Sequence, residues 1–179
     1  METKDIDFSK LSPMMKQYFE VKNKYKNHIL FYRLGDFYEM FFDDAIIASR
    51  ELALTLTGRD CGLEERAPMC GVPHHACDVY LKKLIEKGYN VAICEQTMDP
   101  AMCKGIVPRE VIRVVTPGTL IESSMLDETS NNYICAFYMR AKESALCLAD
   151  ISTGEVHLFE FEGKEMTSSA INELSRFSP

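Results

Sequence analysis

The stretch of residues 31–44 constrains the fold more than any other part of the chain. It holds six aromatic residues and four carboxylates around one glycine. Gly35-Asp36 is a turn signal between two short strand-forming runs, so the stretch predicts two strands joined by a bend. Successive strand residues point to opposite faces of a sheet, so Phe37 and Glu39 should share a side. We expect an aromatic ring and a carboxylate to stand together near an exposed bend.

Strand-forming and helical runs alternate along the rest of the first part of the chain. Strands are expected at residues 28–34, 37–42, 54–57, 91–95 and 110–115, with a short apolar run at 68–72. Helices are expected at 14–25, 43–52 and 76–87. Ser12-Pro13 supports the first of these, because serine is a good N-cap and proline suits the first helical position. The alternation predicts an α/β domain with a mixed β-sheet flanked by about three helices.

The pattern changes at the segment 116–130, which is polar and has no clear period, and we interpret it as a linker. Three strand-like runs follow at 133–140, 144–151 and 155–161, and then a weaker helix at 167–176. Short turn segments separate the three runs, so they predict an antiparallel β meander. The expected organisation is a first domain at 1–115, a linker at 116–130, and the start of a second, truncated domain at 131–179.

Length and composition place the chain among globular proteins. It has 179 residues, of which 46% are hydrophobic, enough to bury a core. No run of about 18 uncharged apolar residues and no signal peptide is present, so we expect a cytoplasmic location without membrane contact. The seven cysteines are scattered, as expected for reduced thiols.

The net charge of −7 is unevenly divided along the chain. Residues 1–118 carry 16 Lys and Arg against 17 Asp and Glu, whereas residues 119–179 carry 4 against 10. The first part is therefore almost neutral and has room for a local basic face. Neither part has the basic stripe of an autonomous DNA-binding module.

Two kinds of metal site are possible from residue types alone. A hydrolytic Mg²⁺ site would draw on Asp36, Glu39, Asp43, Asp44, His74 and His75, and a zinc site on Cys70, His74, His75 and Cys77. The carboxylates have no spacing that makes them converge, and the cysteines form no CxxC pair. We therefore expect no metal and no cofactor in this chain. It also lacks a Walker phosphate loop, a GxGxxG motif and a nucleophile elbow, so we expect no enzyme activity.

Four blocks of sequence resemble the N-terminal mismatch-recognition domain of the bacterial MutS family. They are FYRLGDFYE at 31–39 with PMM at 13–15 before it and DDA at 43–45 after it, PMCGVPHHA at 68–76, VAICEQ at 91–96 and VVTPGT at 114–119. Their order and spacing match the family throughout. The run LADISTGE at 148–155 is similar to the opening hairpins of the family's connector domain, which has a ribonuclease-H-like fold.

The resemblance implies a DNA-binding site around the Phe-x-Glu motif. Phe37 would stack on a mispaired base from the minor groove of a kinked duplex, and Glu39 would form a hydrogen bond to that base. Arg59 would lie near the DNA backbone, and the segment Met69 to Pro73, including Val72, would lie near the same surface. Gly58 stands where relatives often carry lysine, which removes one phosphate contact.

The resemblance also implies a role in DNA mismatch repair. The partners would be mismatched double-stranded DNA, a second copy of the protein in a homodimer, and a MutL-type protein. The full-length protein would be a DNA-dependent ATPase that uses ATP and Mg²⁺ at a site outside this chain. The chain alone should bind DNA weakly, because it is acidic and lacks the family's clamp. Two alternatives stay open here: a metal-dependent nuclease, and a scaffold role for residues 131–179.

Overall fold

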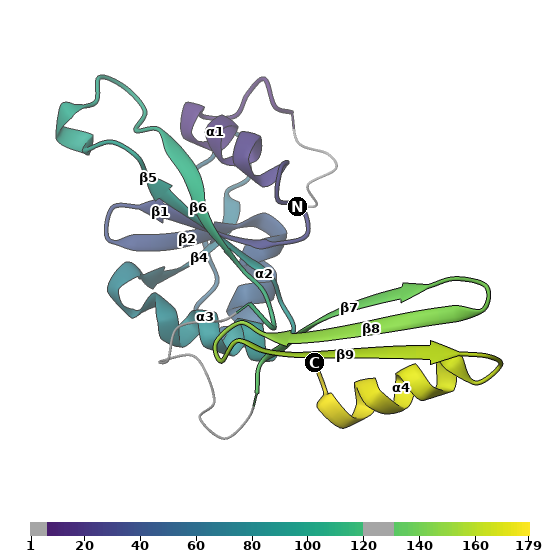
Figure 1. The fold of residues 1–179 in the computed structure, drawn as a ribbon. Coiled ribbons are helices and arrows are strands. Elements are labelled where there is room, and N and C mark those ends of the chain that lie inside the picture. Colours follow the sequence, from purple (N-terminus) through teal and green to yellow (C-terminus); the bar gives the residue numbers. More distant parts are fainter. Residues whose placement is uncertain (1–6, 120–130) are drawn as a thin grey trace. The chain divides into compact units, whose positions relative to one another are not determined.

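The computed structural model describes residues 7–119 and 131–179 (Figure 1). Contacts between Cα atoms divide the chain into two compact units, residues 1–115 and 116–179. Most of the expected linker at 116–130 lies outside the described residues, so the domain boundaries stay a prediction. In the residues that are described, no helix is long and apolar enough to cross a membrane.

The first unit contains a six-stranded sheet in the order β3-β4-β2-β1-β5-β6. Strands β1 and β5 run parallel and all other neighbours run antiparallel, so the predicted mixed sheet is confirmed. The strands are β1 Ile29–Leu34, β2 Phe37–Phe41, β3 Thr57–Arg59, β4 Ala67–Pro73, β5 Val91–Gln96 and β6 Arg109–Val115.

Helix α1 (Pro13–Lys22) begins as the sequence predicts, with the Ser12 hydroxyl accepting a hydrogen bond of 3.4 Å from the Met15 amide. Its apolar stripe, including Tyr18 and Phe19, packs in a core cluster with Tyr32 of β1 and Phe41 of β2. The rings meet mostly edge to face, as aromatic pairs prefer. Helix α1 therefore covers one face of the sheet.

Helices α2 (Phe42–Leu52) and α3 (Cys77–Glu86) pack against each other and against the sheet, α2 on β2 and β4 and α3 on β4 and β5. Figure 1 shows α1 and α3 on opposite sides of the sheet. The short 3-10 helix η2 (His74–Ala76) leads into α3, and a second one, η3 (Pro100–Met102), lies between β5 and β6. The three predicted helices are confirmed, and the two faces of the sheet have different partners.

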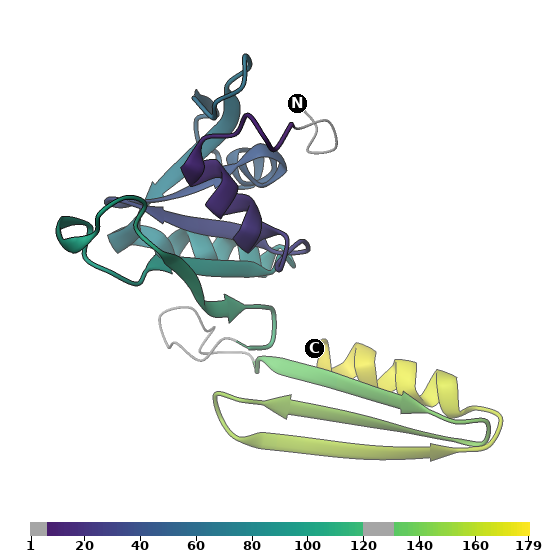
Figure 2. The same cartoon turned by 90° about the horizontal axis from the view of Figure 1, so that it is seen from above.

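The second unit is a three-stranded antiparallel sheet with one helix. Strands β7 Tyr133–Met139, β8 Glu143–Asp150 and β9 Glu155–Glu162 pair in that order, which confirms the predicted meander. Helix α4 (Met166–Phe177) lies along one face of this sheet (Figure 2). Its Leu174 and Phe177 pack against the core cluster of the second unit.

The strand expected at residues 54–57 is wrong in position. Strand β3 begins only at Thr57, because α2 ends on Ala53 in the left-handed conformation (φ +54°) and the Leu54 amide then bonds to the Ser49 carbonyl. This C-terminal turn takes up Leu54, the first residue of the expected strand. Leu56 is 47% exposed, so the apolar residues of the run 54–57 do not mark a buried strand.

Candidate nucleic-acid interface

A two-residue turn, Gly35-Asp36, joins β1 to β2 and carries the candidate site. Leu34 pairs with Phe37 across it, and Gly35 has φ +57° with open space where a side chain would stand. Glycine at the first position is typical of such tight hairpin turns. The Asp36 carbonyl accepts from the His74 amide at 2.9 Å and lies 3.1 Å from the His74 ring Nδ1. The turn is thus fastened to the end of β4.

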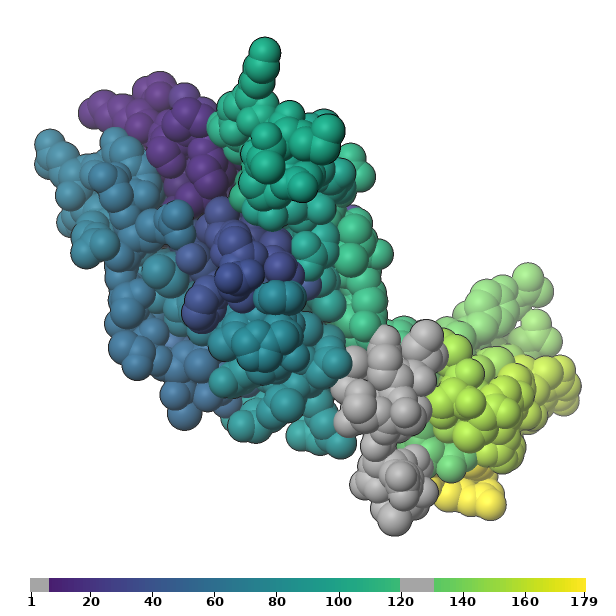
Figure 3. Space-filling model, turned by 90° about the vertical axis from the view of Figure 1, so that its left-hand side faces the viewer, coloured from purple at the N-terminus to yellow at the C-terminus, as the bar shows by residue number. Residues whose placement is uncertain are grey.

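Phe37 is the first residue of β2 and is 47% exposed, whereas the other phenylalanines of the 31–44 stretch are buried. Figure 3 shows the segment around residues 33–38 near the middle of one face, between the segments around 74–80 and 97–108. An exposed ring on a fastened turn contributes little to the core. It is available for contact with another molecule.

Glu39 lies two residues after Phe37, so both side chains face the α1 side of the sheet. Its Oε2 atom forms an ion pair of 2.5 Å with Nη1 of Arg59 on β3. The Glu39 side chain is 15% exposed and that of Arg59 is 38% exposed. The carboxylate therefore stands beside Phe37 with its negative charge balanced by a cation on a neighbouring strand.

Gly71 makes room for this pair of side chains. It is the β4 partner of Glu39, and a Cβ atom there would lie 3.3 Å from the Tyr38 carbonyl, 3.5 Å from Glu39 Cγ and 3.8 Å from Phe37 Cδ1. The first of these distances is tighter than most Cβ contacts in proteins. A side chain at position 71 would crowd both Phe37 and Glu39.

The structure separates the remaining residues expected at the site. Met69 and Pro73 pair with Phe41 and Phe37 in β2, which places them, half-buried, on the same face as Glu39. Val72 pairs with Tyr38 instead, and its side chain is fully buried on the opposite face. A buried side chain cannot touch DNA, so we leave Val72 out of the contact surface proposed below.

The residues considered for metal sites are engaged in other contacts. The Asp44 carboxylate is buried and bonded to Lys22, and the Cys70 thiol donates to the Ala45 carbonyl at 3.5 Å. Burial raises the pKa of Cys70 to about 12, which keeps the thiol protonated. Among the described residues, no three His, Cys, Asp or Glu side chains lie close enough together to hold a metal ion.

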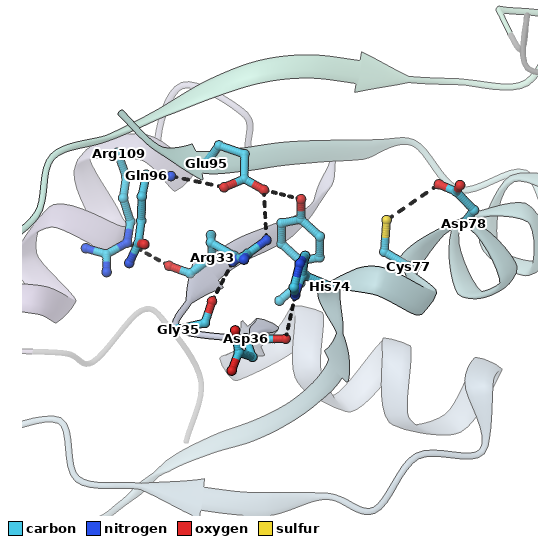
Figure 4. A network of polar contacts seen from close by, with 10 residues as sticks. Arg33, Gly35, Asp36, His74, Cys77, Asp78, Glu95, Gln96 and Arg109 are labelled. Atoms are coloured by element: carbon cyan, nitrogen blue, oxygen red, sulfur yellow. Dashed lines mark hydrogen bonds and ion pairs between the residues drawn. The ribbon is translucent and has the colours of Figure 1, made fainter. Parts of the chain in front are cut away.

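Sequence reasoning missed a polar network on the face opposite Phe37 (Figure 4). Arg33 and Tyr38 both bond there to Glu95 of β5. On the α1 side of the sheet, the Arg109 guanidinium bonds to the backbone carbonyl of Arg33 at 2.7 Å and to Gln17 of α1. The sequence gives only the weak signal that Tyr38 and Arg33 are polar residues inside strands. Glu95 lies about sixty residues further along the chain, and only the parallel pairing of β1 with β5 brings them together.

The chain matches the family description MutS domain I over residues 12–124 and MutS domain II over residues 132–179. The chain belongs to the MutS family. Relatives described as DNA mismatch repair protein MutS from Alkaliphilus oremlandii and Clostridium tetani are each 55% identical over 170 residues, and one from Acetivibrio thermocellus is 56% identical over 169. These alignments cover 94% to 95% of this MutS chain and 19% of the length of each relative. The family membership expected from the sequence motifs is confirmed.

Proposed function

We propose that this chain recognises mispaired or unpaired bases in duplex DNA for mismatch repair, with Phe37 as a wedge inserted from the minor groove. The observation that carries the proposal is the position of Phe37, half-exposed on a fastened turn with the Glu39 carboxylate on the same face. The names of the relatives support it, since each is described as a DNA mismatch repair protein.

The energetics of a wedge favour a mismatch over a normal pair. Inserting an apolar side chain between bases costs a few kcal/mol of unstacking and permits a kinked duplex. Stacking on an aromatic ring returns roughly 1–3 kcal/mol per base. The two nearly cancel, so a ring such as Phe37 inserts where unstacking is cheapest. A mispaired base is such a place, because it is less well held in the stack.

Glu39 would read the base that Phe37 displaces. A carboxylate near phosphates is unfavourable unless it meets a base edge or a cation. Arg59 supplies the cation, which pairs with Oε2 of Glu39. We propose that Oε1 of Glu39 accepts from an N–H group of the base, such as the thymine imino group. We propose that Glu39, Arg59, Met69 and Pro73 surround the wedge, with Arg59 oriented toward the backbone.

The pairing of Arg59 with Glu39 predicts how their substitutions combine. Arg59→Ala should weaken binding to matched and mismatched duplex alike, because it leaves the Glu39 carboxylate facing phosphates without a cation. Glu39→Gln should restore part of this loss, with a coupling of about 0.5–1 kcal/mol for this partly exposed pair. The measurement is a double-mutant cycle of dissociation constants. Arg50→Ala, which removes an exposed cation on α2, is the control. Strictly additive effects would contradict the pairing.

The longer protein implied by the relatives would supply the rest of the activity. We propose that it is a cytoplasmic homodimer that acts with a MutL-type partner and uses ATP and Mg²⁺. The present residues do not fit the nucleotide, because the chain contains no phosphate-loop motif. They also give a metal-dependent nuclease no converging set of ligands among the described residues.

The chain alone should bind DNA weakly, because affinity for duplex DNA comes mainly from phosphate contacts and the chain carries a net charge of −7. The experiment titrates labelled matched and mismatched duplexes at low salt with two proteins. One is the chain itself. The other is a chimaera in which residues 1–179 replace the matching region of the Clostridium tetani relative.

The chimaera is expected to prefer mismatched duplex, and the chain alone to bind both duplexes weakly or undetectably. Tight, mismatch-selective binding by the chain alone would contradict the second expectation. A chimaera that binds DNA without any mismatch preference would contradict the proposed function.

A further inference from the structure

The turn that presents Phe37 is connected to β5 through one carboxylate, Glu95 (Figure 4). The Tyr38 hydroxyl donates a short hydrogen bond to Glu95 Oε1, and Arg33 Nη1 lies 3.3 Å from the same oxygen. The other carboxylate oxygen accepts from the Gln96 amide at 3.2 Å. Both oxygens of Glu95 are therefore engaged, which fixes the direction of its side chain.

Arg33 extends this connection to the turn itself. Its Nε atom donates to the Gly35 carbonyl at 2.5 Å, while its guanidinium carbon lies 5.6 Å from the centre of the Tyr38 ring. The Arg33 and Glu95 side chains are 17% and 24% exposed, so water screens their attraction less than it screens a surface pair. Arg33 joins Glu95 to the backbone of the turn.

Tyr38 extends it to the strand that follows. Tyr38 lies between Phe37 and Glu39 in β2 and points to the opposite face of the sheet. There the centre of its ring is 5.9 Å from the centre of the Phe31 ring. Burial and the Glu95 carboxylate both raise the Tyr38 pKa, which keeps the hydroxyl protonated as a donor. A contact that holds Tyr38 also holds the backbone on both sides of it.

We propose that Glu95 is a positioning residue for mismatch recognition: acting through Arg33 and Tyr38, it holds the Gly35-Asp36 turn so that Phe37 keeps one direction before DNA arrives. The inference rests on the proposed function of Phe37. It adds that the direction of the wedge is set on the face of the sheet away from the DNA. His74, the first residue of η2 directly after β4, fastens the turn on one side, and Glu95 of β5 fastens it on the other.

A fixed wedge binds more tightly because less freedom is lost on binding. Releasing the turn should therefore weaken mismatch binding and leave matched binding unchanged, since the matched duplex does not take up the ring. We expect Glu95→Ala to lower the affinity of the chimaera for mismatched duplex by about 2- to 10-fold. Glu95→Gln keeps an oxygen for the Tyr38 hydroxyl and should lose less.

The direct test uses the chain without DNA. The chain contains no tryptophan, so Phe37→Trp introduces a single indole directly after the turn, which can be excited selectively over the eight tyrosines. Time-resolved anisotropy then separates local motion of the indole from tumbling of the whole molecule. We compare Glu95→Ala, Glu95→Gln and Tyr38→Phe in this background. Glu51→Ala is the matched control, because Glu51 also joins two elements, through Lys87 and Tyr89, and lies outside the hairpin.

Relative to Phe37→Trp alone, we expect Glu95→Ala to increase the share of the anisotropy that decays in the fast phase, which reports local motion of the indole. Tyr38→Phe and Glu95→Gln should increase it less, and Glu51→Ala should leave it unchanged. Thermal melting of each variant checks that it is folded. A purely structural role would lower the melting temperature without changing the fast phase, and that outcome would overturn the proposal. If Glu95→Ala does not fold, the Tyr38→Phe comparison decides.

Failure of the positioning role and failure of the proposed function give different results. An unchanged fast phase in the folded variants contradicts the role of Glu95, whatever the DNA result. A chimaera with the native Phe37 that shows no mismatch preference contradicts the function, whatever the anisotropy. Glu95→Ala could also change the fast phase while the chimaera carrying it binds mismatched duplex as tightly as the unsubstituted chimaera. Holding the direction of Phe37 would then contribute nothing to binding, and this result also overturns the proposal.

Discussion

Phe37→Ala in the chimaera is expected to abolish the preference for mismatched over matched duplex. The substitution removes the ring that would stack on the displaced base, a contact of roughly 1–3 kcal/mol. Since each 1.4 kcal/mol is tenfold in affinity, mismatch binding should fall by about 5- to 150-fold. Binding to matched duplex should change little, because phosphate contacts supply it. Competition between labelled mismatched and unlabelled matched duplex measures the effect.

The same substitution should leave the fold intact, since Phe37 is 47% exposed. Phe137→Ala is the matched control, because Phe137 is also a strand phenylalanine, is 45% exposed, and lies in the second unit. It should alter neither affinity. Strong destabilisation of the chain by Phe37→Ala, with mismatch preference retained, would favour a core role for the ring.

Asp44→Ala is expected to cause the largest loss of stability of any single substitution considered. Asp44 is 5% exposed, with Oδ1 at 2.8 Å from Lys22 Nζ and Oδ2 at 2.9 Å from the Leu30 amide. It thus joins α2 to α1 and β1. Alanine removes the carboxylate partner of the Lys22 ammonium group, which keeps its hydrogen bond to the His28 carbonyl, and it takes the acceptor away from the buried Leu30 amide. Loss of one partner of such a pair costs about 3–5 kcal/mol in the free energy of unfolding.

Urea denaturation of the chain measures this loss, and Asp44→Asn is the control because its amide oxygen can still accept from Leu30.

Burial raises the pKa of Asp44 above its ordinary value of 3.8. The folded chain therefore binds this proton more tightly than the unfolded chain does. The stability that this tighter proton binding contributes is present below pH 3.8, and it is lost as the pH rises through the raised pKa of Asp44 in the folded chain. Asp44→Asn should lack this loss, so its deficit relative to the native chain should shrink across that range. An Asp44→Ala variant as stable as the native chain would contradict the account.

Local sequence signals predicted the elements well where burial and turn chemistry agree. Ser12-Pro13 located the start of α1, and Gly35-Asp36 located the turn between β1 and β2. The strand expected at 54–57 begins only at Thr57, because Ala53 is left-handed and the turn that ends α2 takes up Leu54. A non-glycine residue in this conformation leaves no clear signal in a single sequence.

The candidate site was predictable in its two central residues and not in their partners. Alternation along a strand was enough to place Phe37 and Glu39 on one side. The ion pair of Glu39 with Arg59 spans 20 positions and depends on the order of β2, β4 and β3 in the sheet. The contact of Tyr38 with Glu95 spans 57 positions and depends on the β1 to β5 pairing. Sheet order is a property of the whole fold, which short-range patterns do not report.

Photo-crosslinking from position 37 tests the central claim most directly. A benzophenone amino acid replaces Phe37 in the chimaera, the complex with a duplex containing one mismatch is irradiated, and the adduct is mapped to a nucleotide. The account predicts an adduct at the mispaired base or its neighbour, with a yield that falls sharply on the matched duplex. Equal adduct formation on both duplexes, or adducts scattered along the backbone away from the mismatch, would contradict it.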